Sequence, residues 1–326
     1  MKMIRIFFVV AVIFSGCLEK KSKVQKQNQF HLKFVSQIEF EDISSINRII
    51  SKEKHIYIAD WNNNHIYKID NDDVIVNSFG GVGKGPGEFS KLTDIAIDKN
   101  SFIYASDQNM NRIQVFDENG SFVKSLKTDY SNVGIGLKGE NLLVNSLSPE
   151  YAIYEYNQMG NLINRFVELD KGQDNFLDML KNISRFVTFD DVTYRISYNS
   201  PSIYAIKDSI MSLEFTNNTI DSYNHISFIK EGSEAKLNRG SIVHSDIIVE
   251  KDFIYIVGGG GNNDVPNNKL PHFFNIYNQK WEIMASLYPE NLPYSQEGYT
   301  ICKTGNIVYF GLINGNLVYK FHLDNK

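Results

Sequence analysis

The feature that most constrains the fold of this chain is an internal repeat with an offset of 47 residues. The segment His55–Asp70 aligns without gaps with Phe102–Asp117, and seven of the sixteen aligned residues are identical. Each copy consists of an apolar run, a turn rich in Asp and Asn, and a second apolar run, which predicts a pair of antiparallel strands. Such a repeat indicates an array of similar units that bury their apolar faces against one another.

The sequence around the second copy completes a four-stranded unit. We expect its strands at residues 92–97, 102–106, 112–116 and 121–126. The segment Asp117–Gly120, between the third and fourth strands, is typical of a hairpin, because Asp, Asn and Gly tolerate the backbone conformations of tight turns. Four-stranded units at this spacing predict the blades of a β-propeller.

The same unit carries motifs that resemble the NHL repeat. The matching segments are Gly83–Phe89 (Gly-Lys-Gly-Pro-Gly-Glu-Phe), Ile95–Asp98, Ile103–Asp107 and Asn111–Asp117. The resemblance is specific over residues 79–126, fair over 46–78 and weak elsewhere. Together with the N-terminal segment described below, the chain is similar to the six-bladed β-propeller lipoproteins of Bacteroidota. This resemblance implies a fold more firmly than a function.

Weaker strand pairs continue the array. They lie at 141–145 with 151–156, at 191–197 with 202–206, and at 253–257 with 273–277, and a last unit has strands at 299–302, 307–310 and 316–321. That last unit lacks its outermost strand, whereas a spare strand, 32–40, precedes the first unit. We expect 32–40 to pair with 316–323, because an open ring would leave an unpaired edge.

The predicted fold is therefore all-β: a six-bladed β-propeller of four-stranded antiparallel blades, closed by the N-terminal strand in the last blade. The alternative is a seven-bladed ring, which would require a hidden repeat within residues 127–250.

The N-terminus has the pattern of an export signal. Lys2 and Arg5 precede nine consecutive apolar residues that end at Phe14, and a Ser-Gly pair then precedes Cys17. This apolar run is short for a membrane span. The segment resembles a bacterial lipobox, which implies lipidation of Cys17, although Phe14 departs from the usual aliphatic residue. The alternative is an ordinary signal peptide, or an uncleaved anchor, followed by an incidental cysteine.

We therefore divide the chain into a lipoprotein signal peptide (1–16), a lipidated cysteine with a polar, flexible tether (17–29), and the propeller (30–326). This organisation predicts a palmitate-bearing protein of the cell envelope, anchored at the outer membrane, on a side that the sequence leaves open. The full chain has a net charge of −5, and loss of the two basic residues of the signal makes it about −7. Such an acidic chain disfavours nucleic-acid binding.

Cysteine and histidine usage argues against a disulfide and against a zinc site. If Cys17 carries lipid, Cys302 has no partner, and its strand-like surroundings predict a small buried core side chain rather than a reactive thiol. In amidating lyases of related fold, histidines hold zinc. Here His31 and His322 fall on the closing strands, His65 aligns with Arg112, and the other histidines share no repeat position.

The ligand face is predicted from loop lengths. The turns at 60–64 and 107–111, the connection 80–89, and long insertions at 168–186, 217–243 and 258–271 all fall on one face of the propeller. Functional loops concentrate on rigid scaffolds in this way. Residues 172–182 have the spacing of a short amphipathic helix, either a lid or a packed insertion. The glycines at 258–261 meet neither the phosphate-loop nor the calcium-loop motif and indicate a strand connection.

Six residues of the two repeat turns are the candidates for ligand contact: Asp60, Trp61, Asn64, Asp107, Asn111 and Arg112. The acidic and amide residues are the best candidates for binding calcium or sugar hydroxyls, and Trp61 for stacking on a sugar or peptide. The alternative is structural, because Asp and Asn in turns often cap backbone amides.

The sequence contains no Gly-x-Ser-x-Gly elbow, His-Glu-x-x-His helix or dinucleotide-binding fingerprint. We therefore favour a non-enzymatic, monomeric propeller that binds a protein, peptide or glycan. We predict no cofactor, with bound calcium as the alternative. The alternative is a divalent-metal-dependent lyase or lactonase-like enzyme that works in the central channel.

Overall fold

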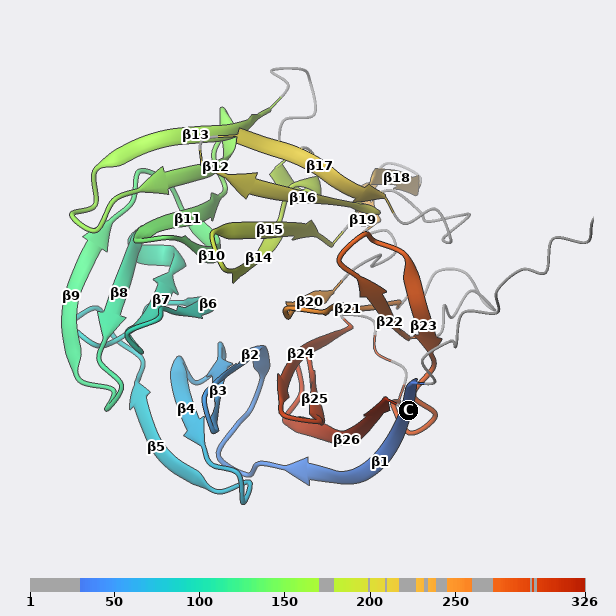
Figure 1. The fold of residues 1–326 in the computed structure, drawn as a ribbon. Coiled ribbons are helices and arrows are strands. Elements are labelled where there is room, and N and C mark those ends of the chain that lie inside the picture. The colour runs from blue at the N-terminus through green and yellow to red at the C-terminus, as the bar shows by residue number, and fades with distance from the viewer. Residues whose placement is uncertain are drawn as a thin grey trace, which may run out of the picture.

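Six four-stranded antiparallel sheets form a ring in the described part of the computed structural model (Figure 1). The structure describes residues 30–325 with the exception of 170–178, 199, 209, 217–226, 232–233, 239–244, 260–271, 294 and 296–297. The predicted lipidation site, tether and glycine-rich segment 260–264 therefore lie outside the described residues. In each blade the strands run in chain order from the axis outward, except in the last, which the N-terminal strand completes.

Blade 1 contains β2 (Ile46–Lys52), β3 (His55–Asp60), β4 (His65–Ile69) and β5 (Ile75–Gly80). Blade 2 contains β6 (Leu92–Ile97), β7 (Ile103–Asp107), the 3-10 turn η1 (Gln108–Met110), β8 (Arg112–Phe116) and β9 (Phe122–Lys127). Blade 3 contains β10 (Asn132–Lys138), β11 (Asn141–Ser146), β12 (Tyr151–Tyr156) and β13 (Leu162–Glu168).

Blade 4 contains β14 (Ser184–Phe189), β15 (Val192–Ser197), β16 (Ser202–Lys207) and β17 (Ile210–Thr216). Blade 5 contains β20 (Asp246–Val249), β21 (Phe253–Gly258), β22 (Phe273–Asn278) and β23 (Ile283–Leu287). Blade 6 contains β24 (Tyr299–Thr304), β25 (Ile307–Leu312), β26 (Leu317–Asn325) and β1 (Phe30–Glu39).

The N-terminal strand closes the ring, as the sequence predicts. β1 pairs antiparallel with β26 from Phe30 opposite Asn325 to Glu39 opposite Leu317, with an irregularity between Phe34 and Ser36. The two ends of the described chain therefore lie side by side on the outer edge of blade 6.

The prediction of a six-bladed ring is confirmed, and the seven-bladed alternative is wrong. Residues 127–250 contain blades 3 and 4, the start of blade 5, and a separate two-stranded hairpin of β18 (Ser227–Glu231) and β19 (Glu234–Asn238). Three insertion boundaries also need correction. Glu168 ends β13 and Ser184–Phe186 belong to β14, so neither is part of the insertion placed at 168–186, and Gly258 ends β21. In all three places backbone pairing extends further than the apolar pattern indicates.

The apolar core is divided among the interfaces between neighbouring blades. Ile49 of β2 packs with Cys302 of β24 and Val318 of β26 in one cluster, whereas Ile95 of β6 packs with Tyr57 of β3 in the next. Strand side chains alternate between the two faces of a sheet, so each blade contributes to two clusters. Each blade therefore buries both of its faces only when its two neighbours are in place.

The turns opposite the long loops share one capping device. At five hairpins, the side-chain Oδ1 of an Asp or Asn accepts the backbone N–H groups two and four residues later, at distances of 2.8 to 3.0 Å. The capping residues are Asp70, Asp98, Asp117, Asn157 and Asn278. This device explains why polar, Asp- and Asn-rich sequence separates the strands of the repeat.

Helical structure is sparse in this fold. Within the described ranges, the structure contains no helix with the length and apolar character that a membrane crossing requires. The predicted short helix at 172–182 falls largely on residues 170–178, which lie outside the described residues. Cys302, in contrast, is described: it is buried within the core, as expected, and burial raises the pKa of its thiol well above the ordinary value.

Candidate functional site

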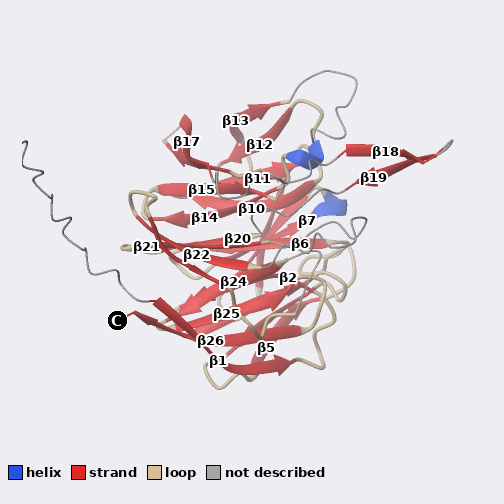
Figure 2. Cartoon of the chain, turned by 90° about the vertical axis from the view of Figure 1, so that its right-hand side faces the viewer, coloured by secondary structure: helices blue, strands red, loops and turns tan. Residues whose placement is uncertain are grey.

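One face of the propeller carries the blade-to-blade connections and the turns between second and third strands. We call it the long-loop face. β18 and β19 project from this side, opposite the chain ends, and Figure 2 shows the hairpin and the C-terminus at opposite extremes of the molecule. Because Phe30 lies opposite Asn325, the chain that precedes β1 enters on the side away from the long-loop face.

Asp60 lies under the first repeat turn and is fully buried. Its carboxylate accepts the backbone N–H groups of Ser44 (2.7 Å) and Ser45 (3.2 Å), and those of Asn62 and Asn63 within its own turn. This side chain therefore ties the turn of blade 1 to the segment that leads into its innermost strand.

Asp107 has the same role in blade 2 and is also fully buried. It accepts the N–H groups of Ser90 (3.1 Å) and Lys91 (3.0 Å), and Nε of Arg112 lies 2.9 Å from its other oxygen. Arg112 also donates to the carbonyl oxygens of Gly85 and Glu88. These contacts fix the connection that enters blade 2.

The two repeat asparagines occupy positions that favour Asn on backbone grounds. Asn64 and Asn111 have φ values of 54° and 49°, in the left-handed region where Asn is tolerated better than most residues. Asn64 also accepts the N–H of Leu92 through its side chain, at 2.7 Å, which links blade 1 to blade 2. The structure thus places the side chains of Asp60, Asp107 and Asn64 in framework contacts, and contact of the predicted residues with a ligand stays a prediction.

Trp61 is the one aromatic residue among the predicted site residues. It is partly exposed on the long-loop face, its Nε1 donates to Ser45, and Nζ of Lys91 lies 5.7 Å from the ring centroid. A tryptophan that already faces a cation from the neighbouring blade presents a flat apolar surface beside a charge. That combination suits the stacking of a sugar ring or a peptide.

The ring axis holds a buried polar network that the sequence analysis did not predict. Its charged members are Arg48 of β2, Asp94 of β6, Arg185 of β14 and Asp246 of β20, and none is more than 5% exposed. All four lie on the innermost strands of their blades. Because the charges are two positive and two negative, they balance one another.

Asp246 is the centre of this axial network. It accepts a hydrogen bond of 2.6 Å from Nη1 of Arg48, one of 2.6 Å from the hydroxyl of Thr300, and one of 3.0 Å from the N–H of Ile301. Nη1 of Arg185 lies 3.4 Å from the same carboxylate. Blades 1, 4, 5 and 6 therefore meet at a single side chain.

The two guanidinium groups and Asp94 extend the axial network to every blade. Arg48 donates to the carbonyl oxygen of Phe186 at 3.2 Å, and Arg185 donates to that of Asn47 at 2.5 Å, so each arginine reaches across the axis. Asp94 lies 3.7 Å from Nε of Arg48 and accepts the N–H of Ile135 in blade 3 at 3.1 Å. The network braces all six innermost strands.

A sequence signal for the axial network does exist. Four of its polar residues directly precede an isoleucine near the start of an innermost strand: Arg48, Asp94, Asp246 and Thr300. In a strand buried on both faces, a charged residue at the same place in several repeats calls for a partner across the axis. The repeats of blades 5 and 6 are weak in sequence, so these four positions are difficult to align from the sequence alone.

Burial and neighbouring charges shift the pKa values of two groups in the axial network in opposing directions. It raises the pKa of Asp94, and the nearby Arg48 and Arg185 oppose that shift. Burial lowers the pKa of Arg185, but Tyr198, Asp246 and Asp94 together raise it above the ordinary value. Both carboxylates of the network accept hydrogen bonds from protein donors, and these bonds link the innermost strands to one another.

Histidines do not converge in the described part of the chain. His31 lies on β1, His322 on β26 and His65 at the start of β4, while His225 and His244 lie outside the described residues. Among the described residues, no three His, Cys, Asp or Glu side chains are close enough to hold a metal ion.

A ring of six blades with a braced axis and one loop-rich face defines a β-propeller scaffold, a class that hosts many functions. The chain belongs to the family described as 6-bladed beta-propeller (DUF5128), whose model matches residues 19–257.

Solved structures share this fold at low sequence identity. A Bacteroides fragilis protein described as a putative exported protein has a TM-score of 0.62 and 13% identity, and the match covers 94% of this chain and 98% of that chain. Virginiamycin B lyase from Staphylococcus aureus has a TM-score of 0.55 and 15% identity, and the match covers 91% of this chain and 100% of that chain. At such identities, the likeness shows the fold alone.

Among curated proteins, the Drosophila melanogaster protein brain tumor is 31% identical over 97 residues, or 27% of this chain. The match spans only 9% of the length of that relative. It is therefore a likeness between short segments.

Proposed function

We propose that this chain is an exported, lipid-anchored envelope protein that binds a protein, peptide or glycan on its long-loop face. The observation that carries the proposal is that the two faces of the propeller differ. The chain enters the propeller on one side, and the long connections and the partly exposed Trp61 lie on the other. An anchor at Cys17 would direct the long-loop face away from the membrane.

The axial network supports a binding role over catalysis in the channel. Its buried acids accept hydrogen bonds from arginines and backbone amides of neighbouring blades. A site that braces the ring in this way is poorly suited to exchange those partners for substrate. The surface around Trp61 and Lys91 has both an aromatic plane and a cation within reach of a ligand.

The anchor is tested in cells that express the full chain. We expect the protein to partition into detergent and to incorporate an alkyne analogue of palmitate, and a Cys17→Ala variant to do neither. A variant that still incorporates the label would contradict the lipid anchor.

The binding face is tested by photocrosslinking in the same cells. A photoreactive residue at Asn62, exposed on the long-loop face, is compared with one at Asn119, exposed on the opposite turns. We expect adducts of higher mass from position 62 and few from position 119. Equal adducts at both positions would contradict the assignment of the face.

The alternative function is a metal-dependent enzyme, and the fold likeness to virginiamycin B lyase is the observation that favours testing it. Metal analysis of the purified full chain is the direct experiment. Stoichiometric calcium or zinc that is lost in an Asp107→Ala variant would support the enzyme and contradict the binding-only proposal.

A further inference from the structure

Five blades carry the same backbone hydrogen bond at the long-loop face. The residue that follows the second strand donates its N–H to the carbonyl oxygen of the residue that precedes the innermost strand. Because this bond uses only backbone atoms, the side chains at these positions can differ from blade to blade. The donor and acceptor pairs are Trp61 and Ser45 (3.2 Å), Gln108 and Lys91 (2.9 Å), Leu147 and Ser131 (2.7 Å), Tyr198 and Ile183 (3.4 Å), and Ile313 and Gly298 (3.3 Å).

The junction between blades 1 and 2 differs from the others in its side chains. Lys91 is the charged residue among these donor and acceptor positions, and Trp61 is the largest aromatic one. The two meet there, with Nζ of Lys91 5.7 Å from the centroid of the Trp61 ring. Since the framework bond does not depend on either side chain, the pairing of an indole with a cation calls for another explanation.

Trp61 is held in a fixed position. Its backbone N–H and its indole Nε1 both donate to Ser45, and the N–H of Ser45 donates to the buried Asp60 carboxylate at 3.2 Å. The indole nitrogen is therefore already bonded, and the ring offers a ligand its carbon atoms only. A ring fixed before binding loses little conformational entropy when a ligand stacks on it.

Lys91 has no carboxylate partner among the residues that the structure describes. Other basic side chains of the propeller do have one: a carboxylate oxygen lies 2.7 to 2.9 Å from a side-chain nitrogen of Arg112, Lys138, Lys303 and Lys320. Lys91 is partly exposed, and its ammonium has three N–H donors. These donors can therefore bind an anion that comes from outside.

Blade 4 contains a similar pairing that is complete within the protein. The guanidinium carbon of Arg185 lies 5.5 Å from the ring centroid of Tyr198, and the carboxylate of Asp246 lies 3.4 Å from the same guanidinium. An aromatic ring, a cation and an acid are thus all present in blade 4. In the described residues at the junction of blades 1 and 2, the ring and the cation are present and the acid is missing.

We propose that Trp61 and Lys91 bind a hexuronic acid unit of an acidic glycan, an inference that rests on the proposed binding role of the long-loop face. The carboxylate of the sugar pairs with the Lys91 ammonium, and the C–H face of the sugar ring stacks on the indole. The flexible stem of lysine lets the ammonium move to the edge of the indole when the sugar covers the ring. Asn62, exposed beside Trp61, offers an amide to the sugar hydroxyls.

An acidic peptide fits this site less well than a uronic acid. Asp and Glu side chains bring a carboxylate but no flat apolar face to cover the indole. A peptide also gains no hydrogen bond from the indole nitrogen, which is bonded to Ser45. A hexuronic acid has both the carboxylate and the flat C–H face in one ring, so it can contact Trp61 and Lys91 together.

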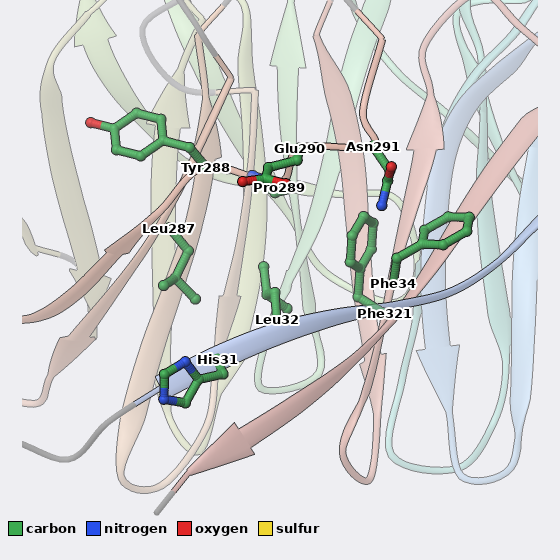
Figure 3. Close-up of a pocket in the computed structure, with 9 residues that line it drawn as sticks. All are labelled: His31, Leu32, Phe34, Leu287, Tyr288, Pro289, Glu290, Asn291 and Phe321. Carbon is green, nitrogen blue, oxygen red and sulfur yellow. The ribbon is translucent and has the colours of Figure 1, made fainter.

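The cleft on the rim of the propeller is a separate feature. It has a volume of about 250 Å³, is lined by residues of β1 and of the end of β23, and holds the rings of Phe34 and Phe321 at one end (Figure 3). Glu290 places a negative charge in its lining. Because that charge repels an anionic sugar, a loss of binding in a Lys91 variant reports on the long-loop face.

The experiment uses the purified full chain in detergent and measures binding by isothermal titration calorimetry. The probes are trigalacturonate and trimannuronate, with galactotriose as the neutral counterpart of the first. We expect both uronates to bind, and galactotriose to bind about tenfold more weakly or less. The affinity for the uronates should fall as the salt concentration rises, because salt screens an ion pair at the surface.

Variants of Lys91 separate its charge from its packing. We expect Lys91→Met, which keeps most of the side-chain stem, to bind the uronates about tenfold more weakly, and Lys91→Arg, which keeps the charge, to bind them nearly as the parent does. The matched control is Lys99→Met, because Lys99 is exposed on a turn of the opposite face, and its binding should be unchanged. Circular dichroism checks that all three variants fold.

Unchanged binding in Lys91→Met, an equal loss in Lys99→Met, or equal binding of galactotriose would overturn the proposal. A triglutamate peptide that binds where the uronates do not would also overturn it, and would leave the proposed function standing. Failure of every probe to bind would overturn the glycan site, and crosslinking at position 62 would then decide the proposed function separately.

Discussion

Removal of the Asp246 carboxylate is the perturbation that best tests the axial network. The variant Asp246→Ala takes the acceptor from Arg48, Thr300 and the backbone of blade 6, and leaves two buried guanidinium groups to share Asp94. Loss of one partner from a buried ion pair typically costs about 3 to 5 kcal/mol. We expect the free energy of unfolding to fall by that amount.

Urea unfolding followed by circular dichroism measures this change. An unchanged slope of the unfolding free energy against urea concentration would show that the variant exposes as much surface on unfolding as the parent does. The control is Asp191→Ala, because Asp191 is an exposed acid on a turn, and we expect an effect within about 0.5 kcal/mol. A loss below about 1 kcal/mol in Asp246→Ala would refute the reasoning.

A double variant separates charge balance from lost hydrogen bonds. Asp246→Ala combined with Arg185→Met restores one cation to one anion at the axis. We therefore expect the double variant to be more stable than the sum of the single effects predicts, by about 0.5 to 3 kcal/mol. If the free-energy changes of the two single variants add up to that of the double variant, the two side chains do not interact.

Three further predictions concern the core and the turns. The Cys302 thiol should not react with a thiol reagent in the folded protein and should react on unfolding in urea, because it is buried and its pKa is raised; rapid reaction without urea would contradict this. Burial raises the pKa of Tyr154 to about 12 from 10.0, so its contribution to stability should be complete below pH 10 and lost as the pH rises towards 12, with a weaker loss in Tyr154→Phe when urea midpoints are compared. Asp117→Ala should destabilise by about 1 kcal/mol while Asp117→Asn changes little, because Asn157 caps the equivalent turn; equal thermal midpoints for the two variants would contradict the capping role.

The fold could be predicted from the sequence where local pattern and repeat agree. In blade 2 the apolar runs, the Asp-rich turns and the motif around Phe89 all indicate the same four strands, and the structure has them within one residue. The closing strand was also predictable, because one unit lacked a strand and the chain had one to spare.

Other elements could not be predicted, for physical reasons. The innermost strand of blade 3 contains Gly134 and Gly136, where a Cβ would lie 2.4 Å from Ser184 and Phe186 of blade 4. Close packing between blades therefore requires glycine in a strand, which local propensity disfavours. The hairpin β18–β19 belongs to no blade, so the repeat gives no signal for it.

The contacts of the candidate residues could not be predicted from the repeat. Asp60 and Asp107 end the equivalent strands β3 and β7, but the repeat motif does not reveal that both carboxylates accept amides from the segment before the innermost strand. The axial network depends on residues from opposite sides of the ring, and only the closed structure brings Arg48 and Asp246 together.

Closure of the ring by β1 also means that blade 6 is completed late in folding. The first described strand pairs with the last described strand, so blade 6 cannot be completed before β26 has been synthesised. Contacts between such distant segments slow folding, because the loop must close before the contacts stabilise it. Until then β1 has no partner, and the exposed edge of β26 is open to pairing with other chains. Truncation anywhere in the last blade is therefore expected to leave the first strand unpaired as well.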